Sequence, residues 1–219
     1  MIIAIDGPAA SGKSTTAKLV AKKLNITYLD TGAMYRAVTL QLLRSNSDFD
    51  NIDKVSSILG NLKIDMYDYK GRDIIKLNNE DVTEEIRSSN VTKYVSEVSA
   101  LLTVREAMVI MQREIGFKTD CVIEGRDIGT KVFPNADYKF YMFADIKMRA
   151  NRRLKEMNQL GIIKSLDEVV SDLEIRDHKD SNRENSPLCK AVDAVEIDTS
   201  NLSIDEQVNK IINHIKINK

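Results

Sequence analysis

The sequence predicts an α/β fold: a five-stranded parallel sheet with helices on both faces and a small inserted antiparallel β lobe. Two observations support this prediction. Short apolar segments alternate with longer segments whose apolar residues recur every three or four positions, which is typical of buried strands connected by helices. Residues 62–87 interrupt the alternation, because two strand-like segments follow each other there. The length of 219 residues suits one domain, 1–219, with this accessory lobe.

The first predicted strand, at residues 1–6, leads into a glycine-rich loop and a helix at residues 14–24. The loop fits the G-x-x-x-x-G-K-[ST] motif of P-loop NTPases, in which backbone N–H groups surround phosphate oxygens. We expect Lys13 to reach the outer phosphates of a nucleoside triphosphate and Ser14 to bind Mg²⁺. The predicted triphosphate-binding residues are Gly7, Pro8, Ala9, Ala10, Ser11, Gly12, Lys13, Ser14 and Thr15.

Composition excludes several classes of protein. A net charge of −1 disfavours a general nucleic-acid or membrane surface, and no apolar segment is long enough to span a bilayer. The two cysteines, Cys121 and Cys189, lie far apart, and no Cys/His cluster indicates zinc. We expect a monomeric, cytoplasmic protein that binds neither nucleic acid nor membrane.

A second strand is predicted at residues 26–30, followed by the turn Thr31-Gly32 and a helix from Ala33 to about Arg44. Arg36 then lies in the first helical turn, where a cation meets the positive end of the helix. A bound anion would explain its place, and a solvated surface arginine is the alternative.

The lobe is expected to contain strands at 63–69 and 73–78, joined by a turn at 70–72. Residues 91–116 are expected to be helical. Their apolar stripe fits two helices better than one, and Thr103 and Glu106 match a capping box, so we predict a break at Thr103. Arg105 would then also lie at a helix start.

Further strands are predicted at Val122-Ile123, 139–144 and 194–198. The first of these leads into residues 124–130, where glycines flank Arg126 and Asp127; this is either a ligand-binding turn or an ion-paired one. Asp145 is expected to start a helix bearing Arg149 and Arg153. Capping boxes are predicted at residues 165–168 and 203–206.

Arg176, Asp180 and Arg183 recur at i, i+4 and i+7 and so share one face of the helix that residue 165 opens. A solvated salt-bridge face is the simplest interpretation. Beside a triphosphate site, a clamp on phosphate and ribose is the better one.

Together these motifs resemble the bacterial cytidylate kinases, members of the nucleoside monophosphate kinase family. The resemblance covers essentially the whole chain. It rests on residues 6–14, residues 30–36, residues 125–130, and Arg176-Asp177 with Asp180, Arg183 and residues 186–188. It implies ATP and CMP or dCMP as substrates, Mg²⁺ as cofactor, residues 62–87 as the nucleoside-monophosphate-binding lobe and residues 155–165 as a short lid.

The resemblance also implies roles for individual residues. Lys13, Arg126, Arg176 and Arg183 would be catalytic. Arg149 and Arg153 lie one helical turn apart, and this spacing makes them our candidates for lid arginines. Tyr35, Arg36 and Arg126 would lie near the acceptor phosphate; Ser96, Arg105 and Asp127 would surround cytosine; and Arg176, Asp180 and Arg183 would bind ribose and phosphates. Thr31 stands where some relatives have serine. The CMP-binding set is therefore Thr31, Tyr35, Arg36, Ser96, Arg105, Arg126, Asp127, Arg176, Asp180 and Arg183.

Two other functions share the phosphate loop. A kinase for another small acceptor, such as UMP or shikimate, would use the same magnesium chemistry. A regulatory or assembly NTPase would instead hydrolyse nucleotide slowly without any acceptor. The pattern shows no further carboxylate for the magnesium ion.

Overall fold

The structure, a computed structural model, describes residues 1–70, 72–159 and 161–217. The chain divides into two compact units. We call Met1–Tyr28 with Gly116–Lys219 the sheet unit and Leu29–Ile115 the inserted unit. The predicted fold class is confirmed: one sheet has five parallel strands, and a separate sheet of three antiparallel strands accompanies it. No helix among the described residues is both long and apolar enough to cross a membrane.

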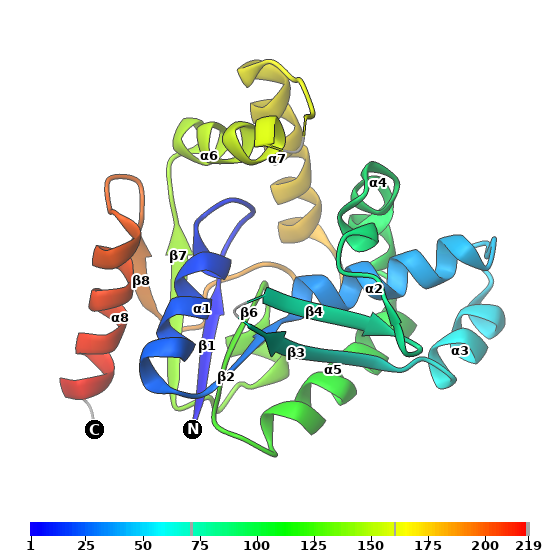
Figure 1. Ribbon diagram of the computed structural model, residues 1–219, viewed down its shortest axis with the longest axis horizontal. Helices are drawn as coiled ribbons and strands as arrows, with labels where there is room; N and C mark the ends of the chain where they lie inside the picture. The colour runs from blue at the N-terminus through cyan, green and yellow to red at the C-terminus, as the bar shows by residue number, and fades with distance from the viewer. Residues whose placement is uncertain (71, 160, 218–219) are drawn as a thin grey trace. The chain divides into compact units, whose positions relative to one another are not determined.

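The five strands lie in the order β2-β6-β1-β7-β8, and β1 runs parallel to both of its neighbours. The carboxyl ends of β1 and β6 are level, because Asp6 pairs with Gly125. The two strands therefore end at the same edge of the sheet (Figure 1), and the residues that follow them share that edge. The strands are β1 (Ile2–Asp6), β2 (Thr27–Asp30), β6 (Cys121–Gly125), β7 (Tyr138–Phe143) and β8 (Val195–Asp198); the helices of the sheet unit are α1 (Lys13–Leu24), α6 (Ile146–Gln159), α7 (Leu166–Asn182) and α8 (Ile204–Ile217), with a π-helical turn, η2 (Ile128–Val132).

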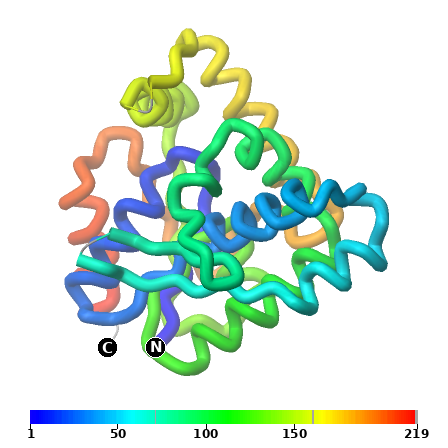
Figure 2. The backbone as a smooth tube through the Cα atoms, turned by 45° about the vertical axis from the view of Figure 1, so that its right-hand side comes forward, coloured from blue at the N-terminus to red at the C-terminus, as the bar shows by residue number. Residues whose placement is uncertain are grey.

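Helices α1 and α8 cover apolar residues of the sheet and lie side by side, blue and red, in both Figure 1 and Figure 2. Ile3, Phe140 and Val208 belong to the core that they share. Ser203 and Glu206 cap the start of α8 as predicted: Ser203 N donates to Glu206 Oε2 at 2.8 Å, and Glu206 N donates to Ser203 Oγ at 3.4 Å.

Helices α6 and α7 pack against each other through a second apolar cluster, which includes Ala150 and Leu173. The predicted capping box of Ser165 and Glu168 opens α7. Position 160, within the predicted 155–165 lid, lies outside the described residues. The role of that range as a lid stays a prediction.

The inserted unit contains the remaining elements. Residues 63–69 and 73–78 were predicted as strands, and β3 and β4 confirm them as an antiparallel pair, with Tyr67 opposite Ile74. Residue 71 of the predicted turn lies outside the described part of the chain. The elements are α2 (Thr31–Arg44), α3 (Ile52–Gly60), β3 (Ile64–Tyr69), β4 (Arg72–Leu77), β5 (Glu80–Asp81), a 3₁₀ turn η1 (Glu85–Arg87), α4 (Ser89–Val98) and α5 (Leu102–Gly116).

Two helix starts differ from the prediction. Thr31 and Gly32 are not a separate turn but the first residues of α2, because the Asp30 carboxylate accepts a hydrogen bond from Ala33 N at 2.9 Å and caps the helix directly. The predicted break in residues 91–116 exists, but it precedes Leu102. Thr103 therefore lies inside α5 and is not its cap, and the first helical bond runs from Arg105 N to Leu101 O.

Candidate active site

The phosphate loop spans residues 7–12, between β1 and α1, and its backbone requires glycine. A Cβ atom at Gly7 would lie 2.0 Å from the Met142 carbonyl oxygen, which is an impossible contact. Gly12 caps α1 with a φ of 91°, in the left-handed region that favours glycine. The loop therefore has one backbone path from strand to helix.

Two side chains of the first turn of α1 meet a carboxylate on β6. Ser14 Oγ donates to Glu124 Oε1 at 2.6 Å, and Lys13 Nζ lies 3.7 Å from Glu124 Oε2. Lys13 also donates to the Pro8 carbonyl oxygen at 3.2 Å. The Lys13 and Glu124 side chains are only 7 % and 4 % exposed. Burial of such a charged pair is costly, so a functional reason for it is expected.

This arrangement fits a magnesium ion that arrives with a nucleotide. Because the Ser14 hydroxyl gives its proton to Glu124, its oxygen lone pairs are available to a metal. Among the described residues, no group of three or more His, Cys, Asp or Glu side chains could hold a metal by itself. One hydroxyl, one carboxylate and phosphate oxygens are typical ligands of Mg²⁺ in kinases, in contrast to ions held entirely by protein.

Side chains of helices α6 and α7 bind the backbone of the phosphate loop at Ala9. The Arg149 guanidinium donates to the Ala9 carbonyl oxygen at 3.2 Å and to Asp177 Oδ2 at 2.5 Å, and Asp177 Oδ1 accepts from Ala9 N at 3.4 Å. Arg149 also donates to the Ala144 carbonyl oxygen. Arg149, predicted to be a lid arginine, is thus buried against the loop, whereas Arg153 is partly exposed and pairs with Glu156 of its own helix.

Three arginines gather around Asp180 near the C-terminal end of α7. Arg126 Nε lies 2.9 Å from Asp180 Oδ2. Burial alone would raise the pKa of Asp180, but the charges of Arg126, Arg176 and Arg183 outweigh it and lower that pKa. The predicted face of Arg176, Asp180 and Arg183 is therefore a compact group that extends to Arg126 on the turn after β6.

Arg176 is a buried cation in surroundings that favour a further negative group. Its Nε is buried and has no hydrogen-bond partner in the described part of the chain. Burial, and then repulsion by Arg126, lowers the pKa of Arg176 to about 10. The guanidinium stays charged at neutral pH, but it lies where another negative group would stabilise it.

Asp127, predicted to read the base, is 3 % exposed and directly precedes the turn η2. Its Oδ1 lies 3.8 Å from Arg183 Nη2, so the two predicted residues come together across 56 positions of sequence, 183 − 127. Asp127 is thus held at the strand end beside the arginine group.

The inserted unit holds the remaining predicted residues. Arg36 Nη1 donates to the Ile86 carbonyl oxygen at 3.1 Å and to Thr92 Oγ1 at 3.0 Å, so Arg36 is not a freely solvated surface arginine. Thr31 is buried at the start of α2.

Arg105 and Tyr35 form a stacked pair in the same unit. The Arg105 guanidinium lies 5.3 Å from the centre of the Tyr35 ring, and Arg105 is 3 % exposed. Arg105 Nη1 donates to the Ser99 carbonyl oxygen, and Ser99 Oγ donates to the Ser96 carbonyl oxygen, both at 3.1 Å. Ser99, at the break between α4 and α5, thus connects Arg105 to Ser96 through two hydrogen bonds.

Sequence comparison identifies the family. The family described as "Cytidylate kinase" matches residues 3–217. The chain belongs to the cytidylate kinase family. A protein of that name from Clostridioides difficile is 49 % identical over 217 residues, which cover 99 % of both chains. Another, from Lactobacillus johnsonii, is 46 % identical over 96 % of this chain and 92 % of its own length. Family membership and the predicted resemblance therefore agree.

A solved structure supports the fold of this cytidylate kinase family member independently. An uncharacterized protein from Eubacterium ventriosum aligns with a TM-score of 0.53 over 99 % of this chain and 98 % of its own, at 13 % identity. That likeness concerns the fold alone.

Two contacts of this cytidylate kinase family member were missed by sequence reasoning. Glu124 was recognised only as part of a strand-end turn, although its place at the end of an apolar strand was a usable signal. The contact of Asp177 with the phosphate loop joins positions 9 and 177 and has no local signal.

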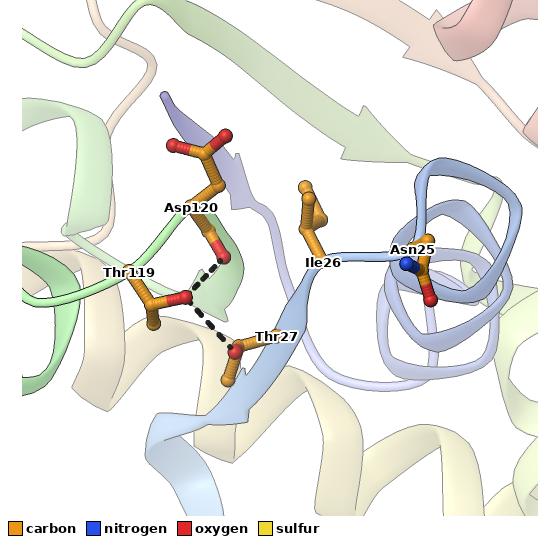
Figure 3. Close-up of a pocket in the computed structure, with 5 residues that line it drawn as sticks. All are labelled: Asn25, Ile26, Thr27, Thr119 and Asp120. Atoms are coloured by element: carbon orange, nitrogen blue, oxygen red, sulfur yellow. Dashed lines mark hydrogen bonds between the residues drawn. The ribbon is translucent and has the colours of Figure 1, made fainter.

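Figure 3 shows a pocket elsewhere in the sheet unit, lined by Asn25, Ile26, Thr27, Thr119 and Asp120. These residues lie at the amino ends of β2 and β6, opposite the edge that bears the phosphate loop. None of the predicted site residues lines this pocket.

Proposed function

We propose that this chain transfers the γ-phosphoryl group of ATP to CMP, giving ADP and CDP, and that it also accepts dCMP. Its family supports the reaction. The observation that carries the proposal is the group of Arg126, Arg176 and Arg183 around Asp180, with Asp127 as a second carboxylate beside Arg183. Two polyanionic nucleotides need such a concentration of positive charge, because catalysis of phosphoryl transfer consists mainly of positioning and charge stabilisation.

The phosphate loop and Lys13 are assigned to ATP. The N–H groups of the loop and the N-terminus of α1 favour the phosphates, and Lys13 stabilises the charge of the transferred group. Ser14 and Glu124 would hold the magnesium ion, which when bound neutralises charge on the phosphate oxygens. Asp177 and Arg149 keep the loop in shape through Ala9.

As the family resemblance implies, Tyr35, Arg36 and Arg126 are assigned to the acceptor phosphate. Because the second pKa of a phosphate monoester is about 6, the attacking oxygen is already ionised at neutral pH. The reaction therefore needs no general base, and Lys13, Arg126, Arg176 and Arg183 serve as the cations of the transfer step.

The base and sugar of CMP are assigned to the remaining predicted residues. Asp127 can accept a hydrogen bond from the exocyclic amino group of cytosine, and Arg105 can donate to the acceptor edge of the ring. Ser96 assists at the base, Thr31 lies at the start of α2, and the face of Arg176, Asp180 and Arg183 binds ribose and phosphates. We further propose that residues 62–87 and the 155–165 lid close over the substrates to exclude water.

A coupled assay of ADP release tests the proposal. The purified chain is given ATP and Mg²⁺ with CMP, dCMP, UMP, AMP, GMP or shikimate, or without an acceptor. We expect release to depend on an acceptor and to be fastest with CMP or dCMP. Equal release with and without every acceptor would indicate an NTPase switch, and a preference for another acceptor would replace CMP in the proposal.

A further inference from the structure

Asp6 connects the phosphate loop to the turn that follows β6. It is not among the residues assigned to substrate binding or to the transfer step. It is the last residue of β1, directly before Gly7, and it is 5 % exposed. Its Oδ1 accepts a hydrogen bond from Ile128 N at 2.9 Å, and its Oδ2 accepts one from Gly129 N at 2.8 Å. Those two amides open the turn η2, which directly follows Arg126 and Asp127.

The turn needs these two bonds. The first N–H groups of any helical turn lack partners within the turn. Later amides of η2 are satisfied internally, since Lys131 N and Val132 N both donate to the Asp127 carbonyl oxygen. No side chain of the turn itself caps it. Asp6 therefore caps η2 from a neighbouring strand, and the buried amides of residues 128 and 129 would otherwise be unsatisfied.

Burial disfavours the ionised form of Asp6, so a carboxyl group at this position needs a structural or functional reason. Burial raises its pKa to about 7, the two backbone amides and Arg126 counteract that rise, and Asp127 adds to it. The approach is also close: a Cβ atom at Gly129 would lie 3.4 Å from Asp6 Oδ2 and 3.2 Å from Lys139 Cδ. The carboxyl group and the turn thus fit each other with little room to move.

We infer that Asp6 is a positioning residue, which fixes the Arg126–Asp127 turn and thereby sets acceptor turnover and base choice. The inference rests on the proposed function of that turn. Among the residues that the structure describes, both hydrogen bonds of the Asp6 side chain go to the turn on the acceptor side. ATP meets residues 7–15, where Gly7, Gly12 and the Ala9 contacts fix the backbone separately.

Asp6→Asn tests this role with little change of shape. The amide keeps one oxygen acceptor but turns an NH₂ donor toward the other backbone N–H, so only one of the two bonds can survive. At pH 8 we expect kcat/KM for CMP to fall about tenfold or more, as for loss of one buried hydrogen bond. The KM for ATP should stay within about twofold, because its loop keeps its contacts.

Asp198→Asn is the matched control. Asp198 ends β8 of the same sheet, and its carboxylate also accepts from a backbone amide, Ser200 N, at 2.9 Å. Its kinetics should match the wild type. Equal losses toward ATP and CMP in Asp6→Asn, or no loss in either, would overturn the inference.

A double-mutant cycle separates positioning from general destabilisation. If Asp6 acts on base choice through Asp127, Asp6→Asn should lower the CMP/UMP ratio of kcat/KM in the wild type. The same change should leave that ratio unaltered in the Asp127→Asn background. Additive effects would contradict the inference. Should Asp6→Asn fail to fold, Gly129→Ala displaces the turn by placing a methyl group against Asp6 Oδ2 and Lys139, and its losses should show the same asymmetry.

Hydrogen exchange distinguishes failure of this inference from failure of the proposed function. The amides of residues 128 and 129 should exchange at least about tenfold faster in Asp6→Asn than in the wild type, whatever the chain phosphorylates. Wild-type turnover of CMP, measured in the same preparation, tests the proposed function by itself. Unchanged exchange at both amides would show that Asp6 does not hold the turn.

Discussion

The two edges of the five-stranded sheet differ in how deeply their polar side chains are buried and in how they are paired. At the carboxyl edge, Asp6, Lys13 and Glu124 are buried, and each meets a partner at hydrogen-bond or ion-pair distance. At the amino edge, the Asp120 side chain is 57 % exposed where it pairs with the Met1 ammonium group. The hydroxyl groups of Thr27 and Thr119 lie 3.5 Å apart, at the limit of a hydrogen bond (Figure 3).

A pocket does not by itself mark a functional site. The amino edge has a pocket, but the polar residues that line it are exposed to water, so they need no compensating partners. Charged side chains are buried at the carboxyl edge. Buried charges are stable only when ion pairs or hydrogen bonds compensate for the lost contact with water. Such compensated burial, together with the lowered pKa of Arg176, indicates where a charged ligand belongs.

Loss of Lys13 should have the largest effect. Lys13→Ala is expected to reduce kcat at least about a hundredfold, because a main charge on the transferred phosphoryl group disappears. Lys23→Ala, at the other end of α1, is the control and should leave kcat unchanged. Retention of more than about a tenth of kcat in Lys13→Ala, against the usual loss of 10² or more, would remove the carboxyl edge as the place of transfer.

Asp127→Asn should change base choice. An asparagine can turn its amide to donate to the carbonyl of uracil, whereas a carboxylate can only accept. An unpaired buried polar group costs about 1–3 kcal/mol, so the CMP/UMP ratio of kcat/KM should fall by roughly ten- to a hundredfold. Melting temperatures of both proteins control for misfolding. A ratio within about twofold of wild type lies below that range and would mean that Asp127 does not read the base.

Glu124→Gln should act through magnesium. Glutamine keeps an oxygen for the Ser14 hydroxyl but removes the charge, and loss of such supporting groups typically weakens metal binding about tenfold or more. The Mg²⁺ concentration for half-maximal activity should rise accordingly, and excess Mg²⁺ should restore most of kcat. An unaltered Mg²⁺ titration would refute this role.

Asp6 predicts a pH effect on stability. Its pKa rises from 3.8 unfolded to about 7 folded, so between these values the folded state binds one more proton. The contribution of Asp6 to the free energy of unfolding is therefore present at low pH and is lost as the pH rises toward 7. The loss is at most about 4 kcal/mol. Urea unfolding at pH 5 and pH 7.5 should show this loss in the wild type and not in Asp6→Asn. Arg126, Asp127 and Tyr141 also face Asp6, but they are common to both proteins and cancel in the difference.

The amino edge should respond least. Thr27→Val removes the contact with the Thr119 hydroxyl in the pocket and nothing at the phosphate loop. We expect kcat and both KM values within about twofold of wild type and a stability change of about 0.5 kcal/mol or less, as for ordinary surface substitutions. A tenfold loss of kcat/KM would show that the comparison of the two edges is mistaken.

Much of the fold could be predicted from the sequence because its determinants are local. Capping at Ser165 and Ser203 involves groups three residues apart, and the hydrogen-bond pattern of a helix start requires that spacing. The phosphate loop is equally local, since Gly7 and Gly12 meet backbone conformations that other residues avoid. Where two local signals compete, prediction erred: Thr103 matched a capping box, but the helix already begins at Leu102.

Only the tertiary structure could decide which distant groups meet. Glu124 reaches Ser14 because β6 and β1 pair in a register that levels their carboxyl ends, and Asp6 caps η2 for the same reason. Arg149 lies against the phosphate loop because α6 and α7 pack together above Ala9. Sequence spacing fixes which side chains share a helix face or a strand end. The register and packing of elements that are distant in the sequence fix which carboxylate each cation meets.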